Sequence, residues 1–461
     1  MPDSAPESAA VSKSPAASRR PGFLRRLTGW LFGSITDVDA GDVTDVSGRQ
    51  HGRAVTALPH AGTPDCFAAP HLLPAEQPAV AGHSERKKRQ AARVGSEEKR
   101  LQQRQRQRDR LTRDITYLGR GVSGRLGERE SRVELLREQS LPVMCTPLDV
   151  ARQLGISLTR LRGLAYHSEV SGRLNYVQFR VCRRNGGERL LSAPHVRLKA
   201  VQRWIHEQIL QRLSVTESAH GFVPGRSILS NAEIHAGQEF VLCMDIRDFF
   251  PSITFPRVRH QFVRCGYSQA VATILALLCT ECPRELVELH GRRAWLSTGP
   301  RGLPQGACTS PALSNLVTAR LDHRLRGLAN RFGLNFSRYA DDLTFSGGPV
   351  IRDRAGWLLE RIRHLIEAEG FQVQEAKTRI QSRASAQVVT GLVVNDRPAV
   401  SRSHVRRMRA ILHQAQSTGL ESQNREQHPN FRAWVEGQIA WIAMTRPQAA
   451  ARLRVQLQQV Q

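Results

Sequence analysis

The stretch FSRYADDLTFS, residues 336–346, constrains the fold strongly because it sets two adjacent aspartates between strand-forming side chains. Neighbouring side chains in a strand point to opposite faces, so Asp341 and Asp342 could not serve one site from an ordinary strand. A hairpin with its tip at Ala340–Asp341 removes this difficulty, because adjacent side chains converge at a tight turn and Asp tolerates the positive φ found there. The stretch therefore predicts a β-hairpin with two carboxylates at its tip.

A third carboxylate follows another strand-like run, FVLCMDIRDFFPSI at 240–253, in which Asp245 ends an apolar segment typical of a buried strand. Three carboxylates on neighbouring strands suit a pair of Mg²⁺ ions, which prefer oxygen ligands and leave positions open for substrate phosphates. Two such ions about 3.5–4 Å apart can activate an attacking hydroxyl and stabilise a leaving oxygen. Taken alone, most such pairs of aspartates in a hairpin are explained by a surface turn.

The charge of the chain indicates its partners. The 461 residues include 67 Lys and Arg against 41 Asp and Glu, a formal net charge of +26. Such a surplus attracts polyanions, with nucleic acid as the first candidate and an anionic membrane surface as the second. No apolar run approaches the roughly 20 residues of a membrane span, so we expect a cytoplasmic protein without a membrane partner. Of the eight cysteines only Cys279 and Cys282 have CxxC spacing, which argues against a zinc site or disulfide framework.

The sequence divides into segments of different character. Residues 1–84 are rich in Ala, Pro, Ser and Gly, which predicts a disordered, low-complexity extension. Residues 85–140 form a basic, partly helical arm, either a solvated linker or a segment that follows a phosphate backbone. The outline of a helix-turn-helix at 146–167 raises another class, a non-catalytic nucleic-acid-binding regulator.

Strand-like and helical runs alternate between 175 and 400, which predicts an α+β domain on an antiparallel sheet. The tail beyond 401 is helical by pattern and basic at its start.

Three motifs together resemble the palm of reverse transcriptases: MDIRDFF around Asp245, GLPQGACTSPALSN at 302–315, and YADD at 339–342. The resemblance implies a right-hand polymerase fold with fingers and an antiparallel palm at 141–400 and a helical thumb at 401–461. It also implies that Asp245, Asp341 and Asp342 are catalytic and hold two Mg²⁺ ions.

The same resemblance implies a pocket for deoxynucleoside triphosphates (dNTPs). Phe250 falls at the aromatic position that blocks a ribose 2′-hydroxyl, with Phe249 beside it, and Gln305 lies in the Pro-Gln-Gly turn that lines the pocket. Lys377, in GFQVQEAKTRI at 370–380, is expected near the triphosphate, although Gln374 replaces the asparagine usual in the family. In the fingers, a phosphate clamp is implied for three arginines around a Gly-Gly turn, for which a solvated basic hairpin is the alternative: Arg183, Arg184 and Arg189.

Two short stretches resemble the signatures of retron reverse transcriptases. NAEIH at 231–235 resembles the NAxxH signature, and VTG at 389–391 resembles the second one. The resemblance implies recognition of RNA by Asn231, Ala232, His235, Val389, Thr390 and Gly391. These residues could instead cap and fill a buried helix and serve a bend.

A retron enzyme is expected to copy a structured noncoding RNA, msr-msd, into msDNA, a branched RNA–DNA hybrid, by priming from a 2′-hydroxyl. The family also implies an effector protein and a role in antiphage defence. A group II intron-type or other bacterial reverse transcriptase is the alternative within this class, but it usually carries a further domain, and only about sixty residues follow VTGLVVN. Incorporation of dNTPs on an RNA template with Mg²⁺ separates all of these enzymes from a non-catalytic regulator.

Overall fold

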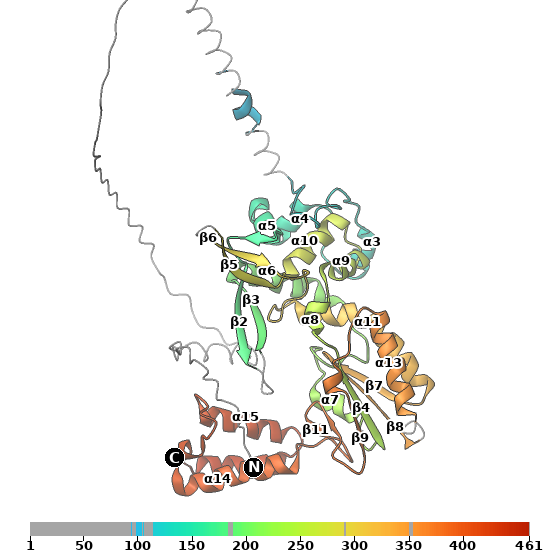
Figure 1. The fold of residues 1–461 in the computed structure, drawn as a ribbon, viewed down its shortest axis with the longest axis vertical. Helices are drawn as coiled ribbons and strands as arrows, with labels where there is room; N and C mark the ends of the chain where they lie inside the picture. Colours follow the sequence, from blue (N-terminus) through green and yellow to red (C-terminus); the bar gives the residue numbers. More distant parts are fainter. Residues whose placement is uncertain are drawn as a thin grey trace, which may run out of the picture. The chain divides into compact units, whose positions relative to one another are not determined.

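The computed structural model describes residues 114–460 apart from 183–187, 290–291 and 350–353, together with Val94, residues 98–103 and Gln105 (Figure 1). All of these belong to one of the two compact units of the chain, Ala81–Gln461. The predicted extension 1–84 lies outside the described residues, and of the basic arm 85–140 the structure describes Val94, residues 98–103, Gln105 and residues 114–140. Both assignments stay predictions. No helix among the described residues has the length and apolar character needed to cross a membrane.

The helix-turn-helix outline forms, but as part of a larger helical core. Thr146 caps α4 (Pro147–Gln153) through a reciprocal capping box with Asp149, and Ser157 caps α5 (Leu158–Ala165). Both helices pack against α10 (Gln269–Cys279), whose residues are buried from Ala270 to its end. A helix that is apolar all round needs cover on every side, and α4 and α5 supply part of it. The other helices of this region are α3 (Val133–Glu138), α6 (Val196–Gln208), η1 (Leu210–Arg212) and α9 (Phe255–Arg264).

Two small sheets project from these helices. One is the hairpin of β2 (Tyr176–Cys182) and β3 (Glu188–Pro194), and the other has the order β1-β6-β5. The bounds of the second sheet are β1 (Val170–Ser171), β5 (Arg284–Leu289) and β6 (Arg292–Ser297).

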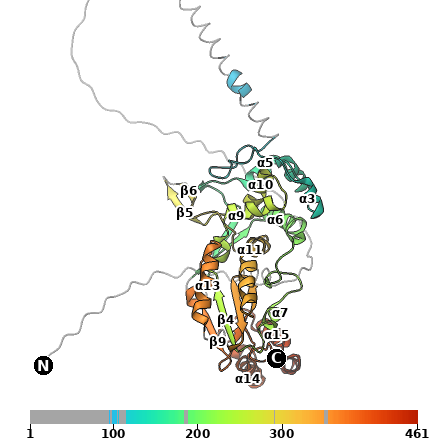
Figure 2. The same ribbon diagram turned by 90° about the vertical axis from the view of Figure 1, so that its right-hand side faces the viewer.

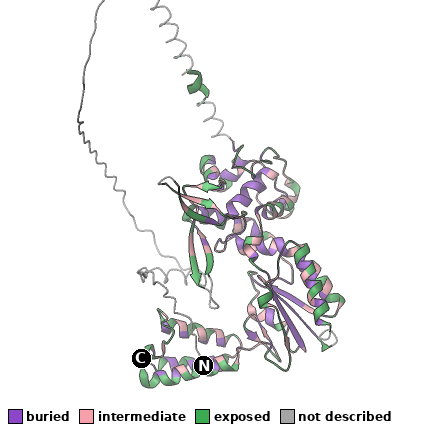
Figure 3. Cartoon of the chain, viewed as in Figure 1, coloured by how far each residue is buried: buried purple, intermediate pink, exposed green. Residues whose placement is uncertain are grey.

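The central sheet is antiparallel throughout and has the order β7-β8-β4-β9, which confirms the predicted α+β architecture. Its strands are β4 (Phe240–Asp245), β7 (Asn335–Tyr339), β8 (Asp342–Gly347) and β9 (Arg379–Ser382), and β4 is buried along its whole length (Figure 3). The helices α11 (Ser310–Arg331) and α13 (Ala355–Ala368) lie beside this sheet in both views (Figures 1 and 2), and α7 (Ile228–Glu233) contacts β7.

Alternate residues of β4 belong to two different cores. Phe240, Leu242 and Met244 pack into the cluster that continues into α13 and the other helices. Val241 and Cys243, which point to the other face, join a second cluster made largely by the C-terminal helices. A single strand therefore connects the two hydrophobic cores.

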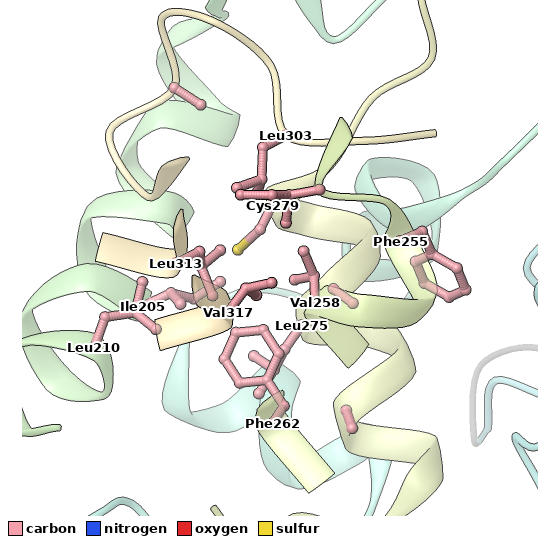
Figure 4. Close-up of a cluster of buried hydrophobic side chains, with 14 of the residues drawn as sticks. Ile205, Leu210, Phe255, Val258, Phe262, Leu275, Cys279, Leu303, Leu313 and Val317 are labelled. Atoms are coloured by element: carbon pink, nitrogen blue, oxygen red, sulfur yellow. The ribbon is translucent and has the colours of Figure 1, made fainter. Parts of the chain in front are cut away.

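The first cluster holds the N-terminal helices against α11. Figure 4 shows side chains of this cluster from α6, η1, α9, α10, α11 and the loop before α11: Ile205, Leu210, Phe255, Val258, Phe262, Leu275, Cys279, Leu303, Leu313 and Val317. Full burial of an aliphatic or aromatic side chain contributes about 1.5–3 kcal/mol, so this cluster fixes the helices in place beside the central sheet.

The tail is helical, as its pattern predicts. A short hairpin of β10 (Val388–Val389) and β11 (Leu392–Val393) leads into α14 (Arg402–Thr418), η3 (Glu421–Gln423), α15 (Phe431–Ala443) and α16 (Pro447–Gln458). One stripe of α14 is buried at helical spacing, at Val405, Met408, Leu412 and Ala415. The three helices contact one another and form a small bundle. Two short elements complete the fold, α8 (Phe249–Ser252) and η2 (Glu375–Lys377).

A buried ion pair ties α11 to the hairpin of β7 and β8. Arg338 in β7 is fully buried and donates to both carboxylate oxygens of Asp322 in α11, from Nε to Oδ1 at 2.6 Å and from Nη2 to Oδ2 at 2.7 Å. Its Nη1 donates to Asn315 Oδ1 at 3.0 Å and to the carbonyl of Ala340, in the turn, at 3.2 Å. Thr216 adds a hydrogen bond to Asp322 Oδ2 at 2.6 Å.

Asp322→Asn should therefore lower the free energy of unfolding by about 3–5 kcal/mol, because removing one charge leaves a buried partner uncompensated. Urea denaturation followed by circular dichroism measures the loss. The matched control is Glu217→Gln, which removes a carboxylate from an exposed pair with Arg326 of the same helix and should change stability far less. Equal effects of the two substitutions would show that the buried pair does not hold the hairpin.

Candidate active site

The predicted hairpin is confirmed, with a two-residue turn at Ala340 and Asp341 between the paired residues Tyr339 and Asp342. Positive φ falls on Ala340, at +59°, rather than on an aspartate as the sequence suggested. Gly221 lies directly behind this turn, where an added Cβ would come within 2.6 Å of the Ala340 nitrogen. The segment before it pairs with β7, with the His220 nitrogen donating to the Arg338 carbonyl at 2.7 Å.

The hairpin brings its two carboxylates to the end of β4. Asp245 and Asp342 are directly paired in the antiparallel register, so their side chains share one face of the sheet, and such Cβ atoms lie about 4.5–5.5 Å apart. The Asp341 carbonyl accepts a hydrogen bond from the nitrogen of Ile246 at 3.0 Å, which fixes the turn beside the strand end. Three acidic residues from two distant segments thus meet in one place.

Burial and neighbouring acidic charge raise the pKa of two carboxyls, Asp341 and Asp342. Burial and the charge of Asp245 raise the pKa of Asp341. Loss of solvent around the carboxylate, followed by the charges of Asp341 and Asp245, raises the pKa of Asp342. A raised carboxyl pKa means that the ionised form is disfavoured where it lies, and a nearby cation relieves this cost.

Lys377 supplies a positive charge at this position. Its ammonium lies 2.6 Å from Asp245 Oδ2, and its side chain remains 55% exposed, whereas the Asp245 side chain is 7% exposed. The nitrogen of Gln374 donates to the Asp245 carbonyl at 2.7 Å, so the segment that ends in η2 is held against the strand end. The family's usual asparagine at position 374 is therefore not needed for this main-chain contact.

The donor set fits a hard divalent cation, although it is not a complete cage. Across the described part of the chain, no group of three or more His, Cys, Asp or Glu side chains is placed closely enough to hold a metal ion by itself. This agrees with the behaviour of Mg²⁺, which usually takes one or two carboxylates and completes its shell with water and substrate phosphates. The ammonium on Asp245 shows that this carboxylate accepts a cation.

A pocket of about 430 Å³ opens beside the carboxylates. It is lined by Asp245 and Asp341 together with most of the residues expected in a nucleotide site: Arg189, Phe250, Gln305 and Lys377. Arg189 donates from Nε to Gln305 Oε1 at 2.5 Å, which joins the fingers hairpin to the Pro-Gln-Gly turn. Arg183 and Arg184 lie outside the described residues. Sequence reasoning did not single out Arg247 and Asp248, which also line the pocket and belong to the same MDIRDFF motif.

The two adjacent phenylalanines have different environments. Phe249 is 3% exposed and packs against Phe371, with ring centroids 6.1 Å apart. Phe250 is half-buried and lies beside Phe222, with centroids 6.1 Å apart. Of the two, Phe250 therefore has the more accessible ring.

The residues of the NAEIH signature lie beneath the surface. His235 is fully buried between two strands of the central sheet, with Nδ1 2.8 Å from Ser346 Oγ and Nε2 2.7 Å from Ser337 Oγ. Burial lowers the pKa of His235 to about 3, so the ring is neutral. Asn231 and Ala232 are also fully buried. None of the three has surface with which to touch RNA directly in this conformation.

The VTG signature contacts α7, the helix that contains Asn231 and Ala232 of the NAEIH signature. Thr390, at φ +46°, donates from Oγ1 to the carbonyl of Ile228 at the start of α7, with a distance of 3.1 Å. Gly391 follows at φ +85°, and Val389 is buried. The two signatures therefore form one connected unit between the central sheet and the C-terminal bundle. Within it, neither amide atom of Asn231 has a hydrogen-bond partner among the described residues.

Comparison with known proteins gives a consistent family. A protein-family model described as reverse transcriptase (RNA-dependent DNA polymerase) matches residues 181–419 of this chain. The retron Mx65 reverse transcriptase of Myxococcus xanthus is 46% identical over 322 residues, which are 69% of this chain and 72% of that protein. The Mx162 enzyme of the same organism is 38% identical over 75% of each chain. The retron Ec86 reverse transcriptase of Escherichia coli is 34% identical over 60% of this chain and 80% of its own.

These relatives decide between the classes that the sequence left open. The helix-turn-helix outline packs into the helical core rather than standing as a separate DNA-binding module. The family match covers the strands that carry the three carboxylates, and the 46% identity is to an enzyme named as a retron reverse transcriptase, which excludes a non-catalytic regulator. The chain therefore belongs to the retron reverse transcriptases, RNA-directed DNA polymerases with a right-hand fold of fingers, palm and thumb.

Proposed function

We propose that the chain is the polymerase of a retron and that Asp245, Asp341 and Asp342 hold two Mg²⁺ ions for phosphoryl transfer. One observation carries the proposal: residues from distant motifs line a single pocket at the carboxylates. When bound, the ions would lower the cost of deprotonating the attacking hydroxyl and of the charge on the leaving oxygen. The three carboxylates would orient the ions, and the raised pKa values of Asp341 and Asp342 fit a site built to share positive charge.

The remaining lining residues suit the parts of a dNTP. Arg189 and Lys377 offer cationic donors to the triphosphate, and Arg183 joins them on the family resemblance. Lys377, which bridges to Asp245, can move to a phosphate because its side chain is half exposed. Gln305 lines the pocket at the base, and Phe250 excludes a ribose 2′-hydroxyl by its bulk.

We further propose that the template is a structured noncoding RNA, msr-msd, and that synthesis starts from a 2′-hydroxyl and yields branched msDNA. The NAEIH and VTG signatures support this assignment through their resemblance to the retron pattern. Because Asn231 and His235 are buried, they act as positioning residues that hold the surface elements presented to RNA. An effector partner and a role in antiphage defence belong to the same proposal and rest on the family.

Asp341→Asn or Asp245→Asn should abolish primer extension while RNA binding persists, because a metal ligand is lost but the basic surface that attracts RNA is kept. Extension of a DNA primer on an RNA template with Mg²⁺, alongside filter binding of the same template, measures both properties. Asp248→Asn is the matched control, because this carboxylate lines the same pocket but is exposed and 3.7 Å from Arg247. Near wild-type extension by either active-site variant would refute the metal assignment.

Phe250→Ala should raise the incorporation of ribonucleotides relative to deoxyribonucleotides, on the order of 10-fold or more, because selection by shape depends on a clash with the wrong sugar. Competing rNTP and dNTP incorporation on one template gives the ratio. Phe249→Ala, at the buried neighbour, should lower thermal stability and leave the ratio near that of the wild type. If Phe249→Ala changed sugar selection and Phe250→Ala did not, Phe249 would be the residue that excludes the ribose 2′-hydroxyl.

Asn231→Ala should reduce branched product from the cognate RNA while extension of an annealed DNA primer on a plain template largely persists. The reason is that Asn231 lies in the unit that the Thr390 hydrogen bond joins to α7 and does not line the pocket at the carboxylates. The branched product is identified by the RNA that stays linked to the DNA after ribonuclease trimming.

Thr390→Val, which removes the hydrogen bond to α7, should act in the same direction as Asn231→Ala. His235→Ala serves as the comparison for damage to the sheet, because it leaves two buried serine hydroxyls without their partner and should lower both activities. Parallel loss of both activities in Asn231→Ala would mean that the signature only supports the fold.

A further inference from the structure

The thumb contains a pocket of about 290 Å³ between α14, η3 and the start of α15. It has no lining residue in common with the pocket at the carboxylates. Its size is at the lower end of the roughly 300–1,000 Å³ typical of small-molecule sites, so it suits one planar group rather than a long ligand. Its lining combines aromatic rings with charged side chains, notably Arg407, Arg425, His428 and Trp434.

Three nearly parallel rings form one side of this pocket. His428 and Trp434 have centroids 4.8 Å apart and planes inclined by 15°, and Trp434 and Phe431 have centroids 5.4 Å apart and planes inclined by 12°. Phe431 belongs to the thumb core, whereas the His428 side chain is 29% exposed. Proteins bind unpaired bases by stacking them on aromatic and histidine side chains of this kind.

The loop that carries His428 is held in a fixed, strained conformation. The Asn424 side chain accepts from the His428 nitrogen at 2.7 Å and donates to the His428 carbonyl at 2.9 Å. Gln427, which lies between Asn424 and His428 in the sequence, adopts φ +51°, a value that a non-glycine residue rarely takes. Strained residues of this kind concentrate at ligand sites, where the surrounding structure holds them. The ring is thus fixed against Trp434 before any ligand arrives.

The charges around the rings favour a polyanion. Glu426, an acid in the pocket lining, is already engaged by Arg407 Nη2 at 2.6 Å and lies 3.2 Å from His428 Nε2. Arg425 is exposed at the rim. A second pocket of about 460 Å³ adjoins the first. The two pockets share the lining residues Ala410 and Gln414. The lining of the second pocket includes no acidic residue but contains three basic ones: Arg409, His413 and Arg452.

We propose that the thumb pocket accepts one unpaired base of an RNA strand, stacked on His428, while the flanking phosphates contact Arg425 on one side and Arg409 and Arg452 on the other. The proposal rests on the proposed function, because the RNA would be the template of this polymerase. RNA fits better than an acidic peptide, because parallel rings in a small pocket match a planar base and the cations on both sides match the phosphates next to it.

The test compares two fluorescein-labelled single-stranded probes, an oligoadenylate and an abasic ribose-phosphate oligomer of the same length, in anisotropy titrations with the full chain. The wild type should bind the oligoadenylate more tightly, by about 5- to 150-fold, which corresponds to one stacked base. His428→Ala should reduce this ratio by about fivefold or more, with affinity for the abasic probe unchanged. His428→Phe, which keeps a ring but loses the contact with Glu426, should restore the ratio.

Arg452→Ala and Arg454→Ala form a matched pair, because both arginines are exposed on α16 but only Arg452 lines the second pocket. Arg452→Ala should weaken both probes alike and lower the salt dependence of binding, since a phosphate contact carries no information about the base. Arg454→Ala should change the affinity for both probes and the salt dependence of binding far less than Arg452→Ala does. Equal ratios in the wild type and His428→Ala, or failure of His428→Phe to restore the ratio, would overturn the proposal, as would tighter binding of an acidic peptide than of the oligoadenylate.

A separate measurement distinguishes this pocket from the proposed function. Wild-type chain is assayed for dTTP incorporation on poly(rA) with an oligo(dT) primer. Absence of incorporation with a normal ratio of the two probes would reject the polymerase proposal and leave the base pocket standing. Normal incorporation with no preference for the base-bearing probe would reject the pocket alone.

Discussion

The arrangement of the active site depends on the buried contact between Arg338 and Asp322. Each of these ions loses hydration worth several kcal/mol on burial, so the pair is tolerated only where nearly every donor and acceptor has a partner. Here the guanidinium reaches α11 through Asp322 and Asn315 and reaches the turn through the Ala340 carbonyl. Asn315 in turn donates to the carbonyl of Gly221 at 2.9 Å, behind the same turn. A turn that must hold two mutually repelling carboxylates is therefore fixed by helix, strand and loop together.

Much of this could be predicted from local pattern. The alternation of side chains around Asp341 and Asp342 required a turn, and the apolar run before Asp245 required a buried strand; the structure pairs these segments residue for residue. Helices with caps and an apolar stripe, such as α4 and α14, also follow directly from their sequences. The local backbone geometry and the spacing of apolar side chains along the sequence determine these features. They therefore do not depend on contacts from elsewhere in the chain.

Other features depend on contacts that no local pattern contains. The close approach of Gly221 to the Ala340 nitrogen joins segments 119 positions apart, and it requires a residue without a Cβ at position 221. The complete burial of Arg338 needs Asp322 from another element, and a basic residue in a strand ordinarily indicates exposure. The thumb pocket likewise joins α14, η3 and α15, whose residues become neighbours only after the bundle packs. Sequence reasoning therefore identified the carboxylates that the structure brings together and missed much of what holds them in place.

His235 shows how a signature residue and a contact residue can differ. Both of its ring nitrogens are taken by serine hydroxyls of β7 and β8, and its lowered pKa keeps it neutral, so it has neither charge nor a free donor to offer a phosphate. It can influence RNA only through the position of the sheet and of α7. The same sheet carries the carboxylates on β4 and β8, and the face of β4 that bears Asp245 also packs on the C-terminal helices through Val241 and Cys243. α7 and the VTG turn therefore share their packing with β4 and the C-terminal helices, because one hydrophobic cluster contains Ala232, Val389, Val241 and Cys243.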